Sequence, residues 1–156
     1  NAAYAFARLA DPRGLSEPRA RACTAITRSM MKHPMMVAGP GRFDTLVMQA
    51  AKNKIATKGG AEGYQAIAVI PGALGKGSPA LGICYKTADG DAAGRSGNII
   101  GITLLQQLGL IKQKDIDSTL AHLAPRPIKN WAGKVVGELR ACFEMDWSAL
   151  GDWVKL

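Results

Sequence analysis

Residues 54–87 read KIATKGGAEGYQAIAVIPGALGKGSPALGICYKT. Within this stretch, residues 54–58, 64–71 and 80–87 have the length and composition of strands, and glycine-rich connections separate them. Connections this short cannot hold a crossover helix, so neighbouring strands should pair in opposite directions. We therefore predict a three-stranded antiparallel meander at the centre of the fold.

Helices are expected upstream of the meander. Residues 2–10 are rich in alanine and end at the turn sequence of residues 11–14. Ser16 then stands where a helix N-cap would, and apolar residues recur on one helical face from residue 22 to residue 30. A second helix should therefore end before Pro34.

A shaped loop is predicted between these helices and the meander. Residues 35–42 contain Gly39 and Gly41 on either side of a proline, so their backbone can adopt conformations closed to other residues. Asp44 or Thr45 can then cap a short helix that ends at the turn before the first strand.

The remainder of the chain predicts two helices and a hairpin. Residues 99–108 supply a helix whose wide apolar coverage indicates burial, and a short helix is expected near residues 115–123. Residues 128–131 and 134–143 flank the two-residue turn Ala132-Gly133, a pattern typical of a hairpin. The whole chain therefore predicts one α+β domain in which helices pack on an antiparallel sheet.

The composition is that of an ordinary globular protein. The 156 residues are 47% hydrophobic and 21% charged. No apolar run reaches the roughly 20 residues of a membrane-spanning helix. The three cysteines, Cys23, Cys84 and Cys142, are widely spaced and odd in number, which favours reduced thiols over a disulfide framework. We expect a cytoplasmic protein without a membrane partner.

The formal charge of +8 raises the question of a nucleic-acid partner. The basic residues are spread from Arg8 to Lys155 without a dense run, and no aromatic side chains are interleaved with them as a stacking surface requires. We therefore expect no nucleic-acid partner and interpret the charge as a solvated surface that attracts an anionic substrate. A non-catalytic basic binding module stays open as an alternative.

The glycine-rich connection after the first strand is the strongest candidate for chemistry. Lys58 ends that strand and could hold a substrate carboxylate or activate a neighbouring hydroxyl, provided that it is partly buried. Gly59 and Gly60 could turn their amides toward a reacting carbonyl, and Glu62 could accept an ammonium group. Taken alone, Lys58 fits a solvated lysine at a strand end somewhat better than a catalytic one.

The loop before the meander offers complementary charges. An amino-acid substrate needs a cation at its carboxylate, for which Arg42 is suited, and a carboxylate at its ammonium group. Glu62 or Asp44 suits the second role, although Asp44 is nearly as well suited to cap the following helix. The two histidines, His33 and His122, cannot be paired with a cysteine at a familiar metal-binding spacing, so we expect no metal site within the chain.

Three segments occur in a specific order: HPMMVAGPGRFDT at residues 33–45, TKGGAEG at residues 57–63 and NWAGKVVGELR at residues 130–140. Together with the helix AAYAFARLA at residues 2–10, they resemble the bacterial asparaginase II family, the thermolabile type found in rhizobia and related bacteria. The resemblance spans nearly the whole chain but only about the C-terminal half of the family's sequence. We therefore expect an incomplete domain, either a fragment or a processed chain.

The resemblance implies hydrolysis of L-asparagine to L-aspartate and ammonia, on a fold similar to that of serine β-lactamases and glutaminases. The family's Ser-x-x-Lys nucleophile and its zinc site would lie upstream of residue 1, so only Lys58 carries over as catalytic. Ser29 and Lys32 satisfy the Ser-x-x-Lys spacing, but they fall where the family does not keep its nucleophile. The alternative on the same fold is a glutaminase or penicillin-recognising amidase, and we expect a homodimer or association with the missing N-terminal segment.

Overall fold

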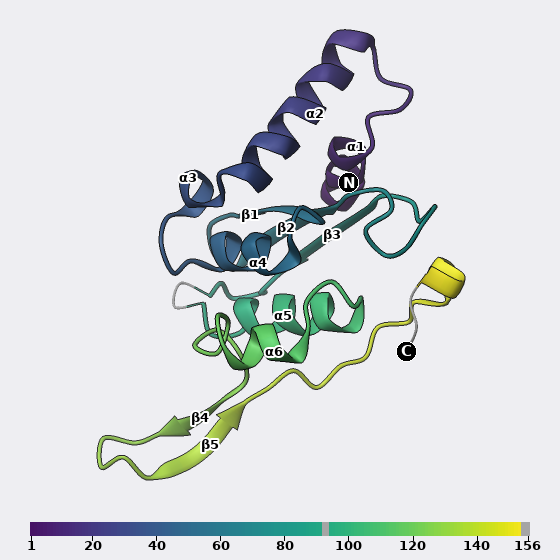
Figure 1. The fold of residues 1–156 in the computed structure, drawn as a ribbon. Helices are drawn as coiled ribbons and strands as arrows, with labels where there is room; N and C mark the ends of the chain where they lie inside the picture. The colour runs from purple at the N-terminus through teal and green to yellow at the C-terminus, as the bar shows by residue number, and fades with distance from the viewer. Residues whose placement is uncertain (92–93, 154–156) are drawn as a thin grey trace.

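The computed structural model describes residues 1–91 and 94–153 and has the α+β architecture predicted from the sequence (Figure 1). Within those residues, none of the helices combines the length and apolar character needed to cross a bilayer. In chain order the elements are α1 (Ala2–Ala10), α2 (Glu17–Lys32), α3 (Pro34–Ala38), α4 (Phe43–Ala51), β1 (Ile55–Gly59), β2 (Tyr64–Val69), β3 (Leu81–Lys86), α5 (Gly97–Gln107), α6 (Gln113–Asp117), β4 (Arg126–Lys129), β5 (Val135–Leu139) and the 3-10 helix η1 (Ser148–Trp153).

The predicted meander is confirmed. β1 pairs antiparallel with β2 and β2 with β3, so that Ile67 of the central strand lies between Thr57 and Ile83. The loop between β1 and β2 turns through Glu62 and Gly63, whose φ angles of 57° and 73° lie in the left-handed region. Glycine adopts this conformation without steric cost, which explains how so short a loop reverses the chain.

The two faces of the sheet differ in side-chain size, because successive residues of a strand point to opposite faces. One face carries the small residues Ala66, Ala68 and Gly82, against which α1 lies. A Cβ on Gly82 would overlap the carbonyl oxygen of Ala3. The small residues therefore admit α1 to direct contact with β2 and β3.

The opposite face carries the large apolar residues of the sheet and faces the core. Ile55, Ile67 and Val69 are fully buried there, and Figure 1 shows α5 on the side of the sheet away from α1. Burying each side chain of this size stabilises the fold by about 1.5–3 kcal/mol. Helices α4 and α5 complete this core with the buried side chains of Val47, Met48, Ile102 and Leu105, and Leu120 joins them from the turns after α6.

The predicted loop at residues 35–42 is a short helix followed by a turn. α3 starts at Pro34, a residue whose fixed φ suits the first helical turn, and it ends at Gly39, whose φ of 89° interrupts the helix. The glycine turn itself covers only residues 39–41. Thr45 donates a 2.6 Å hydrogen bond to the carbonyl of Gly39, which ties the turn to the next helix.

The helix after this turn begins earlier than predicted. α4 starts at Phe43 with Arg42 at its N-cap position, so the prediction that Asp44 or Thr45 caps it is wrong. Phe43 packs into the core, which brings the chain into helical conformation before either residue is reached. Asp44 and Thr45 are instead buried in the first turn, where both side chains bond to other segments.

The second predicted short helix is displaced toward the N-terminus. α6 spans Gln113–Asp117 rather than residues 115–123, and turns follow it as far as residue 123. The backbone N–H of Lys112 donates to the carboxylate of Asp115 at 3.0 Å. This capping interaction places Asp115 inside the first turn of the helix, whereas the sequence predicts that the helix starts near this residue.

The predicted hairpin is confirmed, but its turn is wider than two residues. β4 and β5 pair antiparallel, and the connection runs from Asn130 to Lys134 with a register shift after Ile128. Figure 1 shows the hairpin projecting from the rest of the chain. The side chain of Trp131, in its turn, is completely exposed.

Candidate active site

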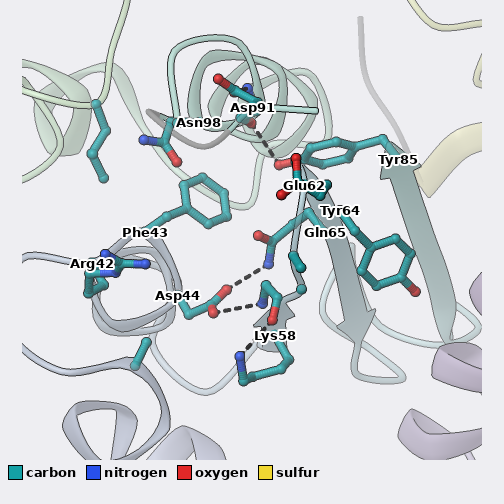
Figure 2. A pocket seen from close by; sticks show the side chains of 18 of the residues that line it. Arg42, Phe43, Asp44, Lys58, Glu62, Tyr64, Gln65, Tyr85, Asp91 and Asn98 are labelled. Atoms are coloured by element: carbon teal, nitrogen blue, oxygen red, sulfur yellow. Dashed lines mark hydrogen bonds between the residues drawn. The ribbon is translucent and has the colours of Figure 1, made fainter. Parts of the chain in front are cut away.

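A cavity of about 800 Å³ lies beside the loop that joins β1 to β2 (Figure 2). It brings together the two glycine-rich segments that the sequence singled out, because residues from 37–44 and from 58–65 line it together. A third part of its wall comes from Tyr85, Asp91, Gly94, Gly97 and Asn98, around the start of α5, and Leu123 completes the lining. The cavity therefore joins segments that are distant in the sequence.

Asp44 is buried at the wall of this cavity, with only 5% of its surface exposed. Its Oδ1 accepts hydrogen bonds from Gln65 Nε2 at 2.6 Å and from Thr57 Oγ1 at 3.1 Å. Its Oδ2 accepts the backbone N–H of Gly59 at 2.8 Å. Strand alternation and pairing bring the side chains of Thr57 and Gln65 to one face of the sheet, and together with the Gly59 N–H they satisfy a carboxylate that is costly to bury alone.

Gly59 and Gly60 both line the cavity, but their amides are engaged within the protein. The Gly59 N–H donates to Asp44, and the Gly60 N–H donates to the carbonyl of Tyr64 at 2.9 Å. In this structure the two amides are therefore not available to a reacting carbonyl, contrary to the expectation from the sequence. The absence of side chains still matters, because a Cβ on Gly60 would stand 2.8 Å from the ring of Tyr64.

Lys58 lies at the end of β1, and its side chain is exposed. Strand alternation directs it away from the face that carries Thr57 and Gly59. Its Nζ donates a 2.6 Å hydrogen bond to the carbonyl of Gly59, so the ammonium group lies at the edge of the cavity. Within the part of the chain that the structure describes, Lys58 therefore lacks the partial burial that was expected of a catalytic lysine.

Asp91 lies at the N-terminus of α5 and also lines the cavity. Its carboxylate accepts the backbone N–H groups of residues 95–97, each at 2.8 Å. Burial raises the pKa of Asp91, but these hydrogen bonds and one from the Ser96 hydroxyl outweigh burial and hold the pKa below its ordinary value. Asp91 is therefore ionised at neutral pH and engaged with the helix end.

Tyr85 lines the same cavity as the carboxylates of Asp44 and Asp91. Its hydroxyl donates a 2.8 Å hydrogen bond to the carbonyl of Gly97, and Gly101 allows this approach because a Cβ there would stand 2.5 Å from the hydroxyl oxygen. Burial raises the pKa of Tyr85, and the negative charges of Asp44 and Asp91 raise it further. The phenol is therefore neutral at physiological pH and acts as a hydrogen-bond donor.

Arg42 and Glu62 bring opposite charges to the cavity. Figure 2 shows them on different sides, Arg42 from the N-cap of α4 and Glu62 from the loop after β1. Both side chains are exposed, and the Glu62 carboxylate lies against Gly90, where a Cβ would overlap it. A cavity with a guanidinium and a carboxylate on separate walls suits a small molecule that carries both charges.

Five polar residues of this cavity were not predicted from the sequence: Tyr64, Gln65, Tyr85, Asp91 and Asn98. A signal existed for Gln65, because it interrupts the otherwise apolar run that follows Tyr64 in β2. Asp91 belongs to an Asp-Gly-Asp sequence, a turn pattern that by itself indicates only where a strand ends. The contribution of Tyr85 and Asn98 depends on how α5 folds back over β3, which local sequence does not indicate.

The other residues considered for chemistry lie elsewhere. Ser29 and Lys32 are exposed on α2, and His33 is exposed at its C-terminal end; none of the three lines the cavity. Across residues 1–91 and 94–151, whose side chains the structure describes, no three His, Cys, Asp or Glu side chains are grouped as a metal ion requires.

Comparison with known families supports the resemblance seen in the motifs. The sequence model of the family described as L-asparaginase II matches residues 1–141, which is most of the chain. The match includes every residue that lines the cavity and the hairpin that follows it. No curated protein sequence matches the chain significantly.

Proposed function

The chain belongs to the L-asparaginase II family, and we propose that the protein hydrolyses the side-chain amide of L-asparagine to L-aspartate and ammonia. The observation that carries this proposal is that one cavity collects Arg42, Glu62 and Lys58. A free amino acid carries an α-carboxylate, an α-ammonium group and, in asparagine, a reactive carboxamide. Arg42 and Glu62 are opposite in sign to the α-carboxylate and the α-ammonium group, and Lys58 adds a positive charge that can stabilise the oxyanion formed from the neutral carboxamide.

Binding of the two ends of the amino acid is assigned to the exposed charges. Arg42 would hold the α-carboxylate, because a guanidinium presents two parallel donors to a carboxylate. Glu62 would accept the α-ammonium group from the other side of the cavity. Asp44, the second acceptor considered from the sequence, is less suited, because three donors within the protein already occupy its oxygens.

The reaction needs a nucleophile, and we propose a serine from a segment upstream of residue 1. Its oxygen would attack the carboxamide carbon, the C–N bond would break, and the amide nitrogen would take up a proton and leave as ammonia. Water would then hydrolyse the ester and release aspartate. Lys58 is proposed to favour the serine alkoxide or the oxyanion by its positive charge, with the upstream segment covering the lysine and supplying the burial this needs.

The experiment compares Lys58→Met with Lys86→Met in the full-length protein. Lys58 Nζ donates to the carbonyl of residue 59 and Lys86 Nζ to the carbonyl of residue 87, both at 2.6 Å, and both lysines are exposed at strand ends. Only Lys58 lines the cavity. The two substitutions thus remove the same charge and the same local hydrogen bond, so Lys86→Met is a matched control.

Ammonia release from asparagine is measured for both variants beside the wild type. We expect Lys58→Met to lower kcat by about 100-fold or more and Lys86→Met to change it by less than about threefold. Equal activity of the two variants would refute the role of Lys58. Assays with glutamine and with a β-lactam separate the asparaginase from the glutaminase or penicillin-recognising alternative, and a wild type that hydrolyses none of them would refute the proposed function.

A further inference from the structure

Asp44 is the one charged side chain that is buried among residues 1–91 and 94–151, whose side chains the structure describes. Because burying a carboxylate is costly, its position needs a reason beyond packing. We propose that Asp44 is a positioning residue that fixes the end of β1 so that Lys58 is presented at the cavity edge. The proposal rests on the role assigned to Lys58 in the proposed function.

The backbone around Lys58 is held at two successive peptide groups. The N–H of the peptide that joins Lys58 to Gly59 is bound by Asp44 Oδ2 at 2.8 Å. The N–H of the next peptide, at Gly60, is bound by the carbonyl of Tyr64 at 2.9 Å, and the carbonyl of that same peptide accepts Lys58 Nζ. Asp44 therefore fixes the peptide that carries Lys58, and the lysine bonds to the peptide that follows.

Two consecutive glycines make this restraint necessary. Gly59 and Gly60 have no Cβ to restrict their backbone, so a strand end that contains them can adopt many conformations. The side-chain hydrogen bond from Asp44 comes from α4, 15 residues earlier in the chain, and ties the strand end to a helix that is anchored in the core. The consequence is a defined position for Lys58 at an otherwise flexible sequence.

A hydrogen bond from Gln65 orients the carboxylate of Asp44 toward Gly59. Gln65 Nε2 donates to Oδ1 and also to Thr57 Oγ1, both at 2.6 Å, so the three side chains form one buried cluster. Thr57 also contacts Oδ1, at 3.1 Å, and leaves Oδ2 to Gly59. Thr57→Val therefore perturbs the same cluster without touching the hydrogen bond to Gly59, and it serves as the matched control.

The test measures kcat and KM for asparagine hydrolysis by the full-length protein, together with hydrogen exchange at the Gly59 amide. We expect Asp44→Ala to lower kcat about tenfold or more, to change KM less than about threefold and to speed exchange at Gly59 about tenfold or more. Thr57→Val should keep both kcat and Gly59 exchange within about threefold of the wild type. Asp44→Asn retains one acceptor oxygen and should fall between the wild type and Asp44→Ala in both measurements.

A purely structural role predicts a different result, namely that Thr57→Val and Asp44→Ala lose activity in proportion to their loss in Tm. That result would refute the proposal, as would a rise in KM at unchanged kcat, because it would make Asp44 a substrate ligand. If Asp44→Ala does not fold, the comparison of Asp44→Asn with Thr57→Val decides in the same way. A wild type without asparaginase activity refutes the proposed function alone, whereas an unprotected Gly59 amide in an active wild type refutes the positioning role alone.

Discussion

Gly82 of β3 lies in direct contact with Ala3 of α1, so closely that a Cβ on Gly82 would overlap the Ala3 carbonyl oxygen. The same Cβ would stand 2.6 Å from the backbone nitrogen of Ala7, one helical turn later. α1 has no fully buried residue, so its attachment depends on this close backbone approach and on the small side chains around it. Gly82 is therefore a determinant of the helix position.

Gly82→Ala should destabilise the protein by about 1–3 kcal/mol, because the added methyl group must displace backbone atoms of α1 rather than a flexible side chain. The measurement is the free energy of unfolding in urea. Gly137→Ala is the control: it lies on the exposed hairpin, and its Cβ would meet only the Ile128 side chain at an ordinary 3.7 Å. Equal stability of the two variants would contradict the packing argument.

The sheet could be predicted from the sequence because its information is local. The strands are short apolar runs between glycines, and the predicted meander needs only neighbouring strands to pair. The alternation of small and large residues in β2 and β3, which separates the α1 face from the core face, was visible in the sequence but acquires meaning only once the register is known. The start of α4 at Phe43 was missed because core packing, rather than a capping side chain, determines it.

The cavity could be predicted only in part, because local sequence patterns do not show which distant segments pack together. Lys58 and Arg42 stand beside glycines, a local pattern, and both line the cavity. Asp44 was recognised as a polar residue of interest, but its burial by Gln65 and Thr57 depends on strand pairing between residues that local motifs do not connect. Asp91 joins the site through the docking of α5, an interaction between distant segments.

Trp131 and Trp147 should differ sharply in their contribution to the free energy of unfolding. Trp131 is completely exposed in the hairpin turn, whereas Trp147 is 9% exposed and packs in the core. Trp131→Ala should change the free energy of unfolding by less than about 0.5 kcal/mol, and Trp147→Ala should lower it by about 3–5 kcal/mol. Urea unfolding measures both. A large loss for Trp131→Ala would show that the hairpin turn is covered in the protein in solution.

Asp91 should make the stability of the protein depend on acidic pH. Its folded pKa is depressed by hydrogen bonds at the start of α5, so its contribution is present above the unfolded pKa and is lost as pH falls through the folded pKa. The difference in Tm between the wild type and Asp91→Asn should therefore be largest above about pH 5 and should shrink as pH falls below about 3.9. Thermal unfolding from pH 7 to pH 3 measures this.

The control for this pH dependence is Asp89→Asn, which removes an exposed carboxylate two residues away. Its Tm should follow that of the wild type at every pH. A gap between the wild type and Asp91→Asn that stays constant down to pH 3 would mean that ionisation of Asp91 does not stabilise the start of α5.

Arg42→Ala should weaken substrate binding rather than slow the chemical step. If Arg42 holds the α-carboxylate, the variant should raise KM for asparagine about tenfold or more with kcat within about threefold of the wild type. The same variant should leave KM unchanged for the analogue in which the α-carboxylate is replaced by a neutral amide. Steady-state kinetics with both compounds measure this, and an equal rise in KM for the two would contradict contact with the carboxylate.

Glu62→Gln should affect the opposite end of the substrate. The substitution preserves the side-chain size and removes the charge that faces the cavity from the loop after β1, so KM for asparagine should rise about tenfold or more at little-changed kcat. Glu62 adopts a left-handed backbone conformation, with φ of 57°, and glutamine experiences the same backbone cost, so the loop should keep its shape. A substrate analogue with a hydroxyl group in place of the α-ammonium should bind the wild type and Glu62→Gln equally, because it offers no charge for the carboxylate to neutralise. If instead the variant lowered kcat for both compounds without changing KM, Glu62 would act on the chemical step, and recognition of the ammonium group would have to be assigned to another acidic side chain.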